Sequence, residues 1–171
     1  MNKYQTALRS LTLAYVAIEK LHARHELIIK GMAKRQMHSA EGLEFARIPK
    51  SLLTPELRVF QKRAQSIGVE LEYELLRLVG TVPPHFHRRS GGTIVKCNAT
   101  GIGTSGILDY LGTYPKKVLW EPIKPGVIKF VPAGMVHGLK YNQEQEDIWS
   151  EQAYFLSVNT PTIEADDVVY V

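Results

Sequence analysis

The stretch GVIKFVPAGMVH, residues 126–137, decides the fold of this chain together with PPHFH at residues 83–87. In the first stretch a strand of five residues ends in a Pro-Ala-Gly turn, and His137 follows three residues after the glycine. A tight turn bounded by proline and glycine fixes where the next strand and its histidine emerge. In the second stretch His85 and His87 lie two residues apart, so an extended chain directs both to one face.

These three histidines are the candidate metal ligands. Neutral imidazole is the commonest metal ligand, and three imidazoles suit Fe, Zn, Cu, Ni or Mn. A single buried histidine is more often a satisfied core residue, but His85, His87 and His137 stand in two ordered motifs, which favours a shared ion. His22 and His25, three residues apart on a predicted helix, are expected to serve helix packing or an oligomer seam.

Length and composition indicate a globular protein. The chain has 171 residues and a mass of 19.3 kDa, which is one domain or one domain with a short extension. Apolar residues make up 44%, enough for a core, and the single cysteine, Cys97, excludes an internal disulfide framework and a Cys-based zinc module. The apolar run 11–18 is too short to span a bilayer and no signal-cleavage site follows it, so a cytoplasmic location is expected.

The positive charge is concentrated near the beginning of the chain. Residues 1–65 carry 12 Lys/Arg against 5 Asp/Glu, and residues 66–171 carry 9 against 12. The basic part contains no nucleic-acid motif and no basic run interleaved with aromatic residues, so a solvated helical face is favoured over nucleic-acid binding. No membrane association is expected.

The first third of the chain reads as a helical extension, residues 1–55. Apolar residues recur at alternating spacings of three and four over 3–30, which predicts one long helix ending near Gly31. A second, weaker helix is predicted at 39–45, and the prolines within 46–55 predict a connector. Because the long apolar stripe must be buried, it should either cover the β domain or pair with the same helix of a second copy, and a homodimer is favoured.

From about Leu57 the pattern becomes one of strands, which defines a predicted β domain at 56–171. Val69, Leu71, Tyr73 and Leu75 alternate with three glutamates, which predicts one buried and one solvated face, and Leu75-Leu76 suggests a bulge. Many short strands separated by Gly and Pro indicate a sandwich or barrel. Further strands are predicted at 93–97, 117–120, 127–131, 136–141, 152–158 and 167–171.

At the two histidine motifs the sequence resembles the cupin superfamily. The second cupin motif, Gly, five residues, Pro-x-Gly, two residues and His, matches 126–137 residue for residue. The first motif is His-x-His followed after three or four residues by Glu; His85 and His87 match, but Gly91 and Gly92 stand at the Glu positions. The resemblance covers two thirds of the chain. It implies a mainly β double-stranded β-helix, or jelly-roll barrel, with a metal in its mouth and an N-terminal α-helical extension.

The missing glutamate affects the expected chemistry. Three neutral ligands leave the 2+ charge of an ion uncompensated, so the site attracts anions and keeps coordination positions open. Ferrous iron could then bind an anionic substrate and dioxygen together, whereas zinc would hold a water of lowered pKa. Within the cupins this ligand set looks like that of thiol dioxygenases and some diketone-cleaving dioxygenases. The resemblance therefore favours Fe(II), with Zn, Ni or Mn as alternatives.

Thiol dioxygenases also carry a Ser-x-His-x-Tyr relay that orients substrate and oxygen. This chain has Ser150-Glu-Gln152-Ala-Tyr154, in which Gln152 replaces the histidine. The resemblance implies a catalytic role for Tyr154 and a substrate contact for Gln152. The alternative is an ordinary strand with both side chains on its inward face.

Two arginines directly follow the histidine pair. Arg88 and Arg89 could clamp a carboxylate or phosphate of the substrate, and they could equally be solvated loop charges. Arg58, Arg77 and Lys129 are alternatives for the same role.

Three functions remain open at this point. The first is a non-haem Fe(II)-dependent dioxygenase, an oxidoreductase acting on a small anionic substrate. The second is a non-catalytic cupin module that senses a small ligand. The third is a zinc- or manganese-dependent isomerase or hydrolase. The sequence contains no residue pattern that indicates a dedicated general acid or base.

Overall fold

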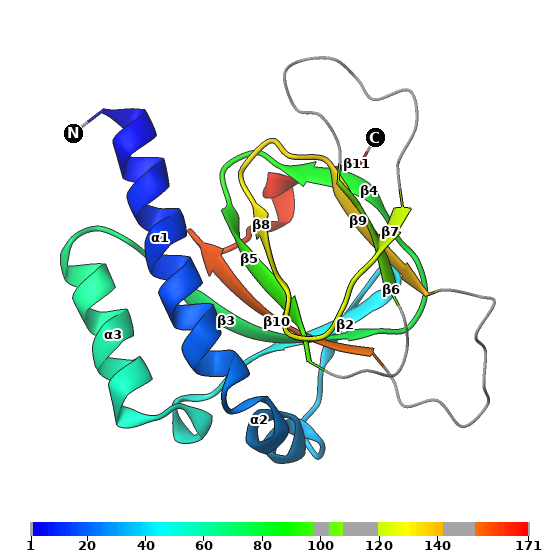
Figure 1. Cartoon of the computed structure of the whole chain (residues 1–171), viewed down its shortest axis with the longest axis horizontal. Coiled ribbons are helices and arrows are strands. Elements are labelled where there is room, and N and C mark those ends of the chain that lie inside the picture. Colours follow the sequence, from blue (N-terminus) through cyan, green and yellow to red (C-terminus); the bar gives the residue numbers. More distant parts are fainter. Residues whose placement is uncertain (1, 98–102, 108–119, 142–152, 171) are drawn as a thin grey trace.

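The computed structural model describes residues 2–97, 103–107, 120–141 and 153–170. In these residues two antiparallel sheets face each other as a barrel, and helices pack on the outer side of one sheet (Figure 1). The prediction of a mainly β jelly-roll barrel with an N-terminal helix is confirmed. Among the described helices, none is both long and apolar enough to cross a membrane.

The larger sheet has six strands in the order β1-β2-β3-β10-β5-β8, and the smaller has five in the order β11-β4-β9-β6-β7. The strands are β1 (His38–Ala40), β2 (Leu43–Arg47), β3 (Glu72–Leu78), β4 (Val82–His87), β5 (Gly91–Lys96), β6 (Gly103–Ile107), β7 (Trp120–Pro122), β8 (Ile128–Val131), β9 (His137–Tyr141), β10 (Ala153–Thr160) and β11 (Val168–Tyr170). The predicted strand at 117–120 falls within the described residues only at its last position, and residue 152 lies outside them.

The helices are α1 (Lys3–His22), α2 (His25–Met32) and α3 (Pro55–Ser66), with short 3-10 turns η1 (Lys50–Leu52) and η3 (Ala165–Asp167). Asn2 and Gln5 form a capping box at the start of α1. The buried stripe of α1 packs on β5 and β10, and the Thr93 hydroxyl of β5 donates to the Ala14 carbonyl of α1 at 3.3 Å.

The single helix predicted over 3–30 is wrong, because the chain turns at residues 23–24 between α1 and α2. The apolar spacing continues across this break since both helices bury side chains in one cluster, for example Leu21 of α1 and Ile28 of α2. The apolar periodicity of the sequence reflects this shared burial and does not show that one helix axis continues through the segment.

The helix predicted at 39–45 is also wrong, because β1 and β2 form a hairpin there. Gly42 takes a φ of 73° in the turn, and β2 pairs along its whole length with β3. Sheet pairing therefore overrides the local helix preference of this segment. The hairpin lies within the predicted extension of residues 1–55 and yet belongs to the six-stranded sheet.

The strand pattern predicted from Leu57 is wrong for the segment that forms α3. Thr54 caps this helix by accepting from the Leu57 amide at 3.1 Å, and Pro55 occupies its first turn. The Thr-Pro pair that suggests a connector is therefore a helix start. Leu57 and Ala64 are buried in the same cluster as α1.

The strand predicted around 69–75 is observed as β3, but both of its faces are covered. Tyr73 and Leu75 point to the helices, whereas Leu76 and Leu78 point into the barrel. The bulge predicted at Leu75-Leu76 is wrong, because β3 keeps one register against β2 and β10 from end to end. Two adjacent leucines are accommodated because each face has its own apolar cluster.

The prediction of a solvated face on this strand is wrong as well. Glu72 and Glu74 are 8% and 7% exposed, and both line the interior of the barrel. The outer face of the sheet is occupied by α1 and α3, so the glutamates point into the barrel interior. An alternating pattern distinguishes an apolar face from a polar one, but it does not tell solvent from an internal cavity.

Candidate metal centre

The histidine-bearing strands are neighbours in the five-stranded sheet. His85 of β4 pairs in register with His137 of β9, and His87 lies one alternation further along β4. Proline residues at 83 and 84 are tolerated in this strand because a register irregularity separates Val82 from His85. The side chains of His85 and His87 therefore share the inward face, as predicted.

The turn between β8 and β9 fixes the third histidine. Gly134 takes a φ of 85°, which favours glycine, and its amide donates to the His87 carbonyl at 2.8 Å. The Met135 amide closes the turn on the Pro132 carbonyl at 3.1 Å. This backbone bridge between the two sequence motifs explains why the Pro-x-Gly spacing places His137 beside the His-x-His pair.

The three imidazoles converge. Their ring centroids lie 4.3 Å apart for His85 and His137 and 5.1 Å apart for His87 with either partner. One nitrogen from each ring lies within 4.8 Å of the others, so the group could hold a metal ion. It is the one such group of histidine, cysteine and carboxylate residues among the described positions.

The hydrogen bonds orient the rings for binding. The Nδ1 atoms of His85 and His137 lie 2.8 Å from the carbonyls of Pro83 and Met135. A carbonyl accepts only from a protonated nitrogen, which leaves Nε2 of each neutral ring as the lone-pair donor. The residues present therefore fit a metal with imidazole ligands.

Burial keeps these rings neutral. It is the largest cause that lowers the pKa of His87 to about 4 and of His137 to about 3, and mutual repulsion with His85 lowers both further. Burial also lowers the pKa of His85. Because a metal competes with a proton for the same lone pair, low pKa values favour metal binding at neutral pH.

Asp167 of η3 is a residue that the sequence did not reveal. Its carboxylate is 1% exposed, accepts from the amides of Arg89 and Ser90 at 2.6 and 3.2 Å, and lies 3.5 Å from Nδ1 of His87. A carboxylate behind a ligating histidine orients the ring and raises its basicity. Only the pairing of β11 with β4 brings this distant residue to the site.

The position of the missing cupin glutamate has no room for a side chain. A Cβ atom on Gly92 would lie 1.9 Å from the Val158 carbonyl oxygen of β10, and one on Gly91 would lie 3.1 Å from the Ala133 amide. The close approach of β5 to β10 therefore explains the glycine at position 92, whereas Gly91 is crowded less severely, by residues 131–133.

Of the remaining predicted site residues, those that the structure describes point away from the histidines or lie exposed beside them. Tyr154 packs on the helix-facing side of β10, in the apolar cluster that contains α1, and hydrogen-bonds Arg77. Gln152 lies outside the described residues. Arg88 and Arg89 are exposed on the turn after β4, where Arg89 pairs with Asp166 at 2.7 Å.

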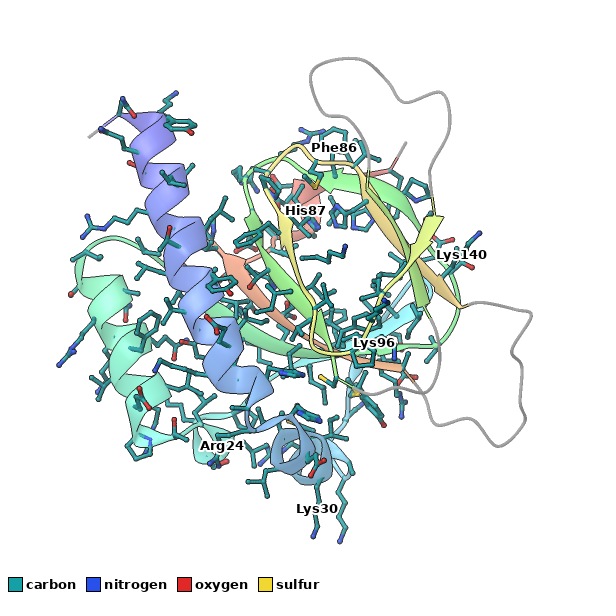
Figure 2. The ribbon with its side chains drawn as sticks, in the orientation of Figure 1. Arg24, Lys30, Phe86, His87, Lys96 and Lys140 are labelled. Atoms are coloured by element: carbon teal, nitrogen blue, oxygen red, sulfur yellow. The ribbon has the colours of Figure 1, made fainter. Side chains whose placement is uncertain are left out.

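The histidines line a cavity of about 1110 Å³ between the two sheets. An apolar cluster that also contains Phe155 contributes Leu76 and Leu139 to its lining. Arg47 and Lys129 also line it, so Lys129 is the alternative cation that the structure places at the cavity. In Figure 2 the labelled His87 and Lys96 lie on opposite sides of the barrel outline, consistent with the pairing of Lys96 to Phe155 at the apolar end.

Comparison with known proteins identifies the fold. No protein-family model and no curated protein matches the sequence. Among solved structures, the oxalate decarboxylase of Lactobacillus farciminis matches with a TM-score of 0.51 and 14% identity over 82% of this chain and 34% of its own. A Streptomyces protein, PAC13, solved with uridine, matches with a TM-score of 0.51 and 10% identity over 82% of this chain and 87% of its own.

An oxalate oxidase in complex with glycolate also matches, with a TM-score of 0.49 and 17% identity over 80% of this chain. The present chain spans 58% of that protein and about a third of the oxalate decarboxylases. The oxalate decarboxylase and the Streptomyces protein are cupins. The chain therefore has the cupin fold, with three histidines that could bind a metal ion at the expected place.

Proposed function

We propose that this chain is a metal-dependent cupin enzyme, a non-haem Fe(II) dioxygenase acting on a small anionic substrate. The observation that supports it most is the donor set: three neutral imidazoles, the buried His85 and His87 and the partly buried His137, facing a cavity large enough for a small molecule. No carboxylate joins this group among the described residues. A bound ferrous ion would supply dioxygen chemistry and an uncompensated positive charge.

The protein's own residues have defined tasks in this proposal. The carbonyls of Pro83 and Met135 hold two rings in the ligating tautomer, and Asp167 steadies the third. The apolar end of the cavity excludes water from one side of a bound substrate. Tyr154 has no part in the reaction, because it lies on the other face of β10.

Oxygen uptake by the iron-loaded protein tests this function directly. A panel of thiols, diketones and hydroxy acids should contain at least one compound that stimulates uptake, and the same compound should give none with His137→Ala. Copurification of zinc with no oxygen uptake would instead favour a hydrolase or isomerase. Ligand binding without any turnover would favour the sensing module.

We further propose that the chain acts in the cytoplasm as a homodimer joined through the free end of α1. Tyr4 and Leu8 are 76% and 54% exposed there, and Tyr15 stacks on the half-exposed Phe130 of β8 at 5.5 Å. A second copy of the chain would remove this apolar surface from water. Sedimentation of Leu8→Asp should give half the mass of the natural protein, while an unchanged mass would disprove this interface.

A further inference from the structure

The wall of the cavity that faces the histidines carries charged groups that the metal centre does not use. Glu72 and Glu74 of β3 and Ser157 and Asn159 of β10 are all at least nine-tenths buried and line the same cavity. The register pairs Glu72 with Asn159 and Glu74 with Ser157, so the four side chains form one patch. We call this patch the carboxylate wall, and the three histidines the histidine wall.

The two walls lie at the same end of the barrel. Asn159 pairs with Gly92 near the start of β5, and only residues 88–90 separate β5 from His87 at the end of β4. Leu76 and Leu78, toward the opposite end of β3, belong to the apolar cluster between the sheets. A ligand between the sheets would therefore contact both walls.

One acceptor of the carboxylate wall is unused. Arg47 of β2 donates to Oε1 of Glu72, Asn159 donates to Oε1 of Glu74, and the Ser157 hydroxyl donates to the Asn159 side-chain oxygen at 2.8 Å. Oε2 of Glu72 is buried and has no hydrogen-bond partner. A buried charged acceptor without a donor is costly, so this atom indicates a missing N–H or O–H group.

The carboxylate wall carries more negative than positive charge. Two carboxyls are opposed by one guanidinium, and the Arg47 side chain is 70% exposed to water, which weakens its field. Lys129 and Arg35 line the cavity, but no ion pair joins them to either glutamate among the described residues. Burial first, and repulsion by Glu72 second, raise the pKa of Glu74 to about 7. A cation placed between the carboxyls would relieve both effects.

We propose that the carboxylate wall binds an organic ammonium group of the ligand. The ligand class is then a small molecule with a protonated amine at one end and an anionic group at the other, spanning the cavity from wall to wall. The ammonium approaches Glu72 and Glu74 from the cavity that both residues line. The inference that the ligand has an anionic end rests on the proposed function of the histidine wall. The inference that it has an ammonium end does not.

Titration calorimetry with a simple diamine tests the ammonium site without the metal. Putrescine, which has no anionic group, should bind the metal-free protein and should bind Glu72→Gln and Glu74→Gln about tenfold more weakly, since a charge-assisted contact is lost. Arg47→Gln should bind putrescine more tightly than the natural protein, because it removes a competing cation. A variant that fails to fold cannot produce this gain.

A second titration on the zinc-loaded protein separates the two walls. Amino acids of increasing length, β-alanine, γ-aminobutyrate and δ-aminovalerate, are compared with matched unsubstituted and hydroxy acids. The best amino acid should bind about tenfold more tightly than both of its counterparts. His137→Ala should weaken all three classes alike and keep the amine preference, whereas Glu72→Gln should abolish only the preference.

Several results would overturn the proposal. These are no putrescine binding by the natural protein, equal binding by Glu72→Gln, or a hydroxy acid that binds as tightly as the amino acid. Failure of the proposed function is distinct, because it would appear as absent oxygen uptake or absent metal while putrescine binding persists.

Discussion

The two walls of the cavity accommodate their buried polar groups in opposite ways. On the histidine wall, burial lowers the pKa of each imidazole, backbone carbonyls lie 2.8 Å from Nδ1 of His85 and His137, and the Asp167 carboxylate lies 3.5 Å from Nδ1 of His87. On the carboxylate wall, burial raises the pKa of Glu74, and side chains from β2 and β10 donate to one oxygen of each glutamate, while Oε2 of Glu72 has no partner among the described residues.

The difference shows what each wall can hold. Neutral nitrogen donors that converge within 4.8 Å suit a metal ion, whose charge then attracts anions. Paired carboxyls with an unused acceptor suit a donor group that carries positive charge. One cavity thus offers sites of opposite preference on its two sheets, and the following changes separate them.

His137→Ala should have the largest effect on the histidine wall. Removing one of three ligands should lower metal affinity by more than about a hundredfold, beyond what loss of an outer partner costs. Metal quantification on purified protein and titration of the metal-free protein measure it. His25→Ala, a histidine outside the cavity, is the matched control and should keep its metal. Full metal content in His137→Ala would show that the metal binds elsewhere in the protein.

Gly92→Ala should destabilise the whole barrel. Its Cβ would overlap the Val158 carbonyl on the neighbouring strand, so β5 and β10 must separate, at a cost of about 2 kcal/mol or more. Urea unfolding followed by circular dichroism gives the change. Gly80→Ala meets only an ordinary contact at 3.5 Å and should be close to neutral. Equal stabilities for the two variants would contradict the packing described for β5.

Asp167→Asn should weaken metal binding by about tenfold to a hundredfold without removing a ligand. The amide keeps an oxygen for the Arg89 amide but loses the charge that steadies His87. Asp166→Asn alters an exposed neighbour that pairs only with Arg89, so its affinity should not change. Competition titration with a chelator measures the metal affinity of both variants. Identical affinities would show that Asp167 does not contribute to metal binding.

Glu74→Gln should show the smallest effect, a change in how stability depends on pH. A carboxyl with a higher pKa in the folded chain holds its proton more tightly there, so the natural protein loses stability as pH rises from about 4.5 to about 7. The neutral amide lacks this loss, and the variant should be more stable by about 2 kcal/mol at pH 8 and equal near pH 4.

Thermal unfolding across this pH range measures the Glu74 effect. Glu70→Gln alters the exposed member of the same alternating series and should follow the natural protein. The groups that act on Glu74 are Glu72, Asn159 and Arg47, so all three remain unchanged in this comparison. A Glu74→Gln profile parallel to that of the natural protein would show that the carboxyl is not held in a desolvated site.

The histidine wall could be predicted from the sequence because short sequence motifs determine where its side chains point. A His-x-His pair and a Pro-x-Gly turn each fix a side-chain direction within a few residues, and one backbone bond from Gly134 to His87 joins them. The barrel followed from many short strands of regular spacing.

The carboxylate wall and Asp167 could not be predicted, because they depend on which segments cover which face. The alternation at Glu72 and Glu74 looks the same whether the polar face meets solvent or a cavity. Helix α3 helps to cover the outer face of the sheet, which leaves the glutamates inside the barrel. The Thr54-Pro55 sequence at its start resembles a connector, so the helix was not predicted. Asp167 reaches His87 only through the β11–β4 pairing, which no local pattern encodes. Tyr154 was expected near the metal from a short resemblance, but the alternation of β10 directs it outward.

The central claim is that His85, His87 and His137 bind one metal ion that no carboxylate of the protein shares. X-ray absorption spectroscopy of the iron-loaded protein tests it most directly, because imidazole rings give a characteristic outer-shell scattering. The account predicts a spectrum fitted by three imidazoles per iron with only water or added ligand in the other positions. A spectrum with fewer imidazoles, or one that changes in Glu72→Gln or Glu74→Gln, would contradict it.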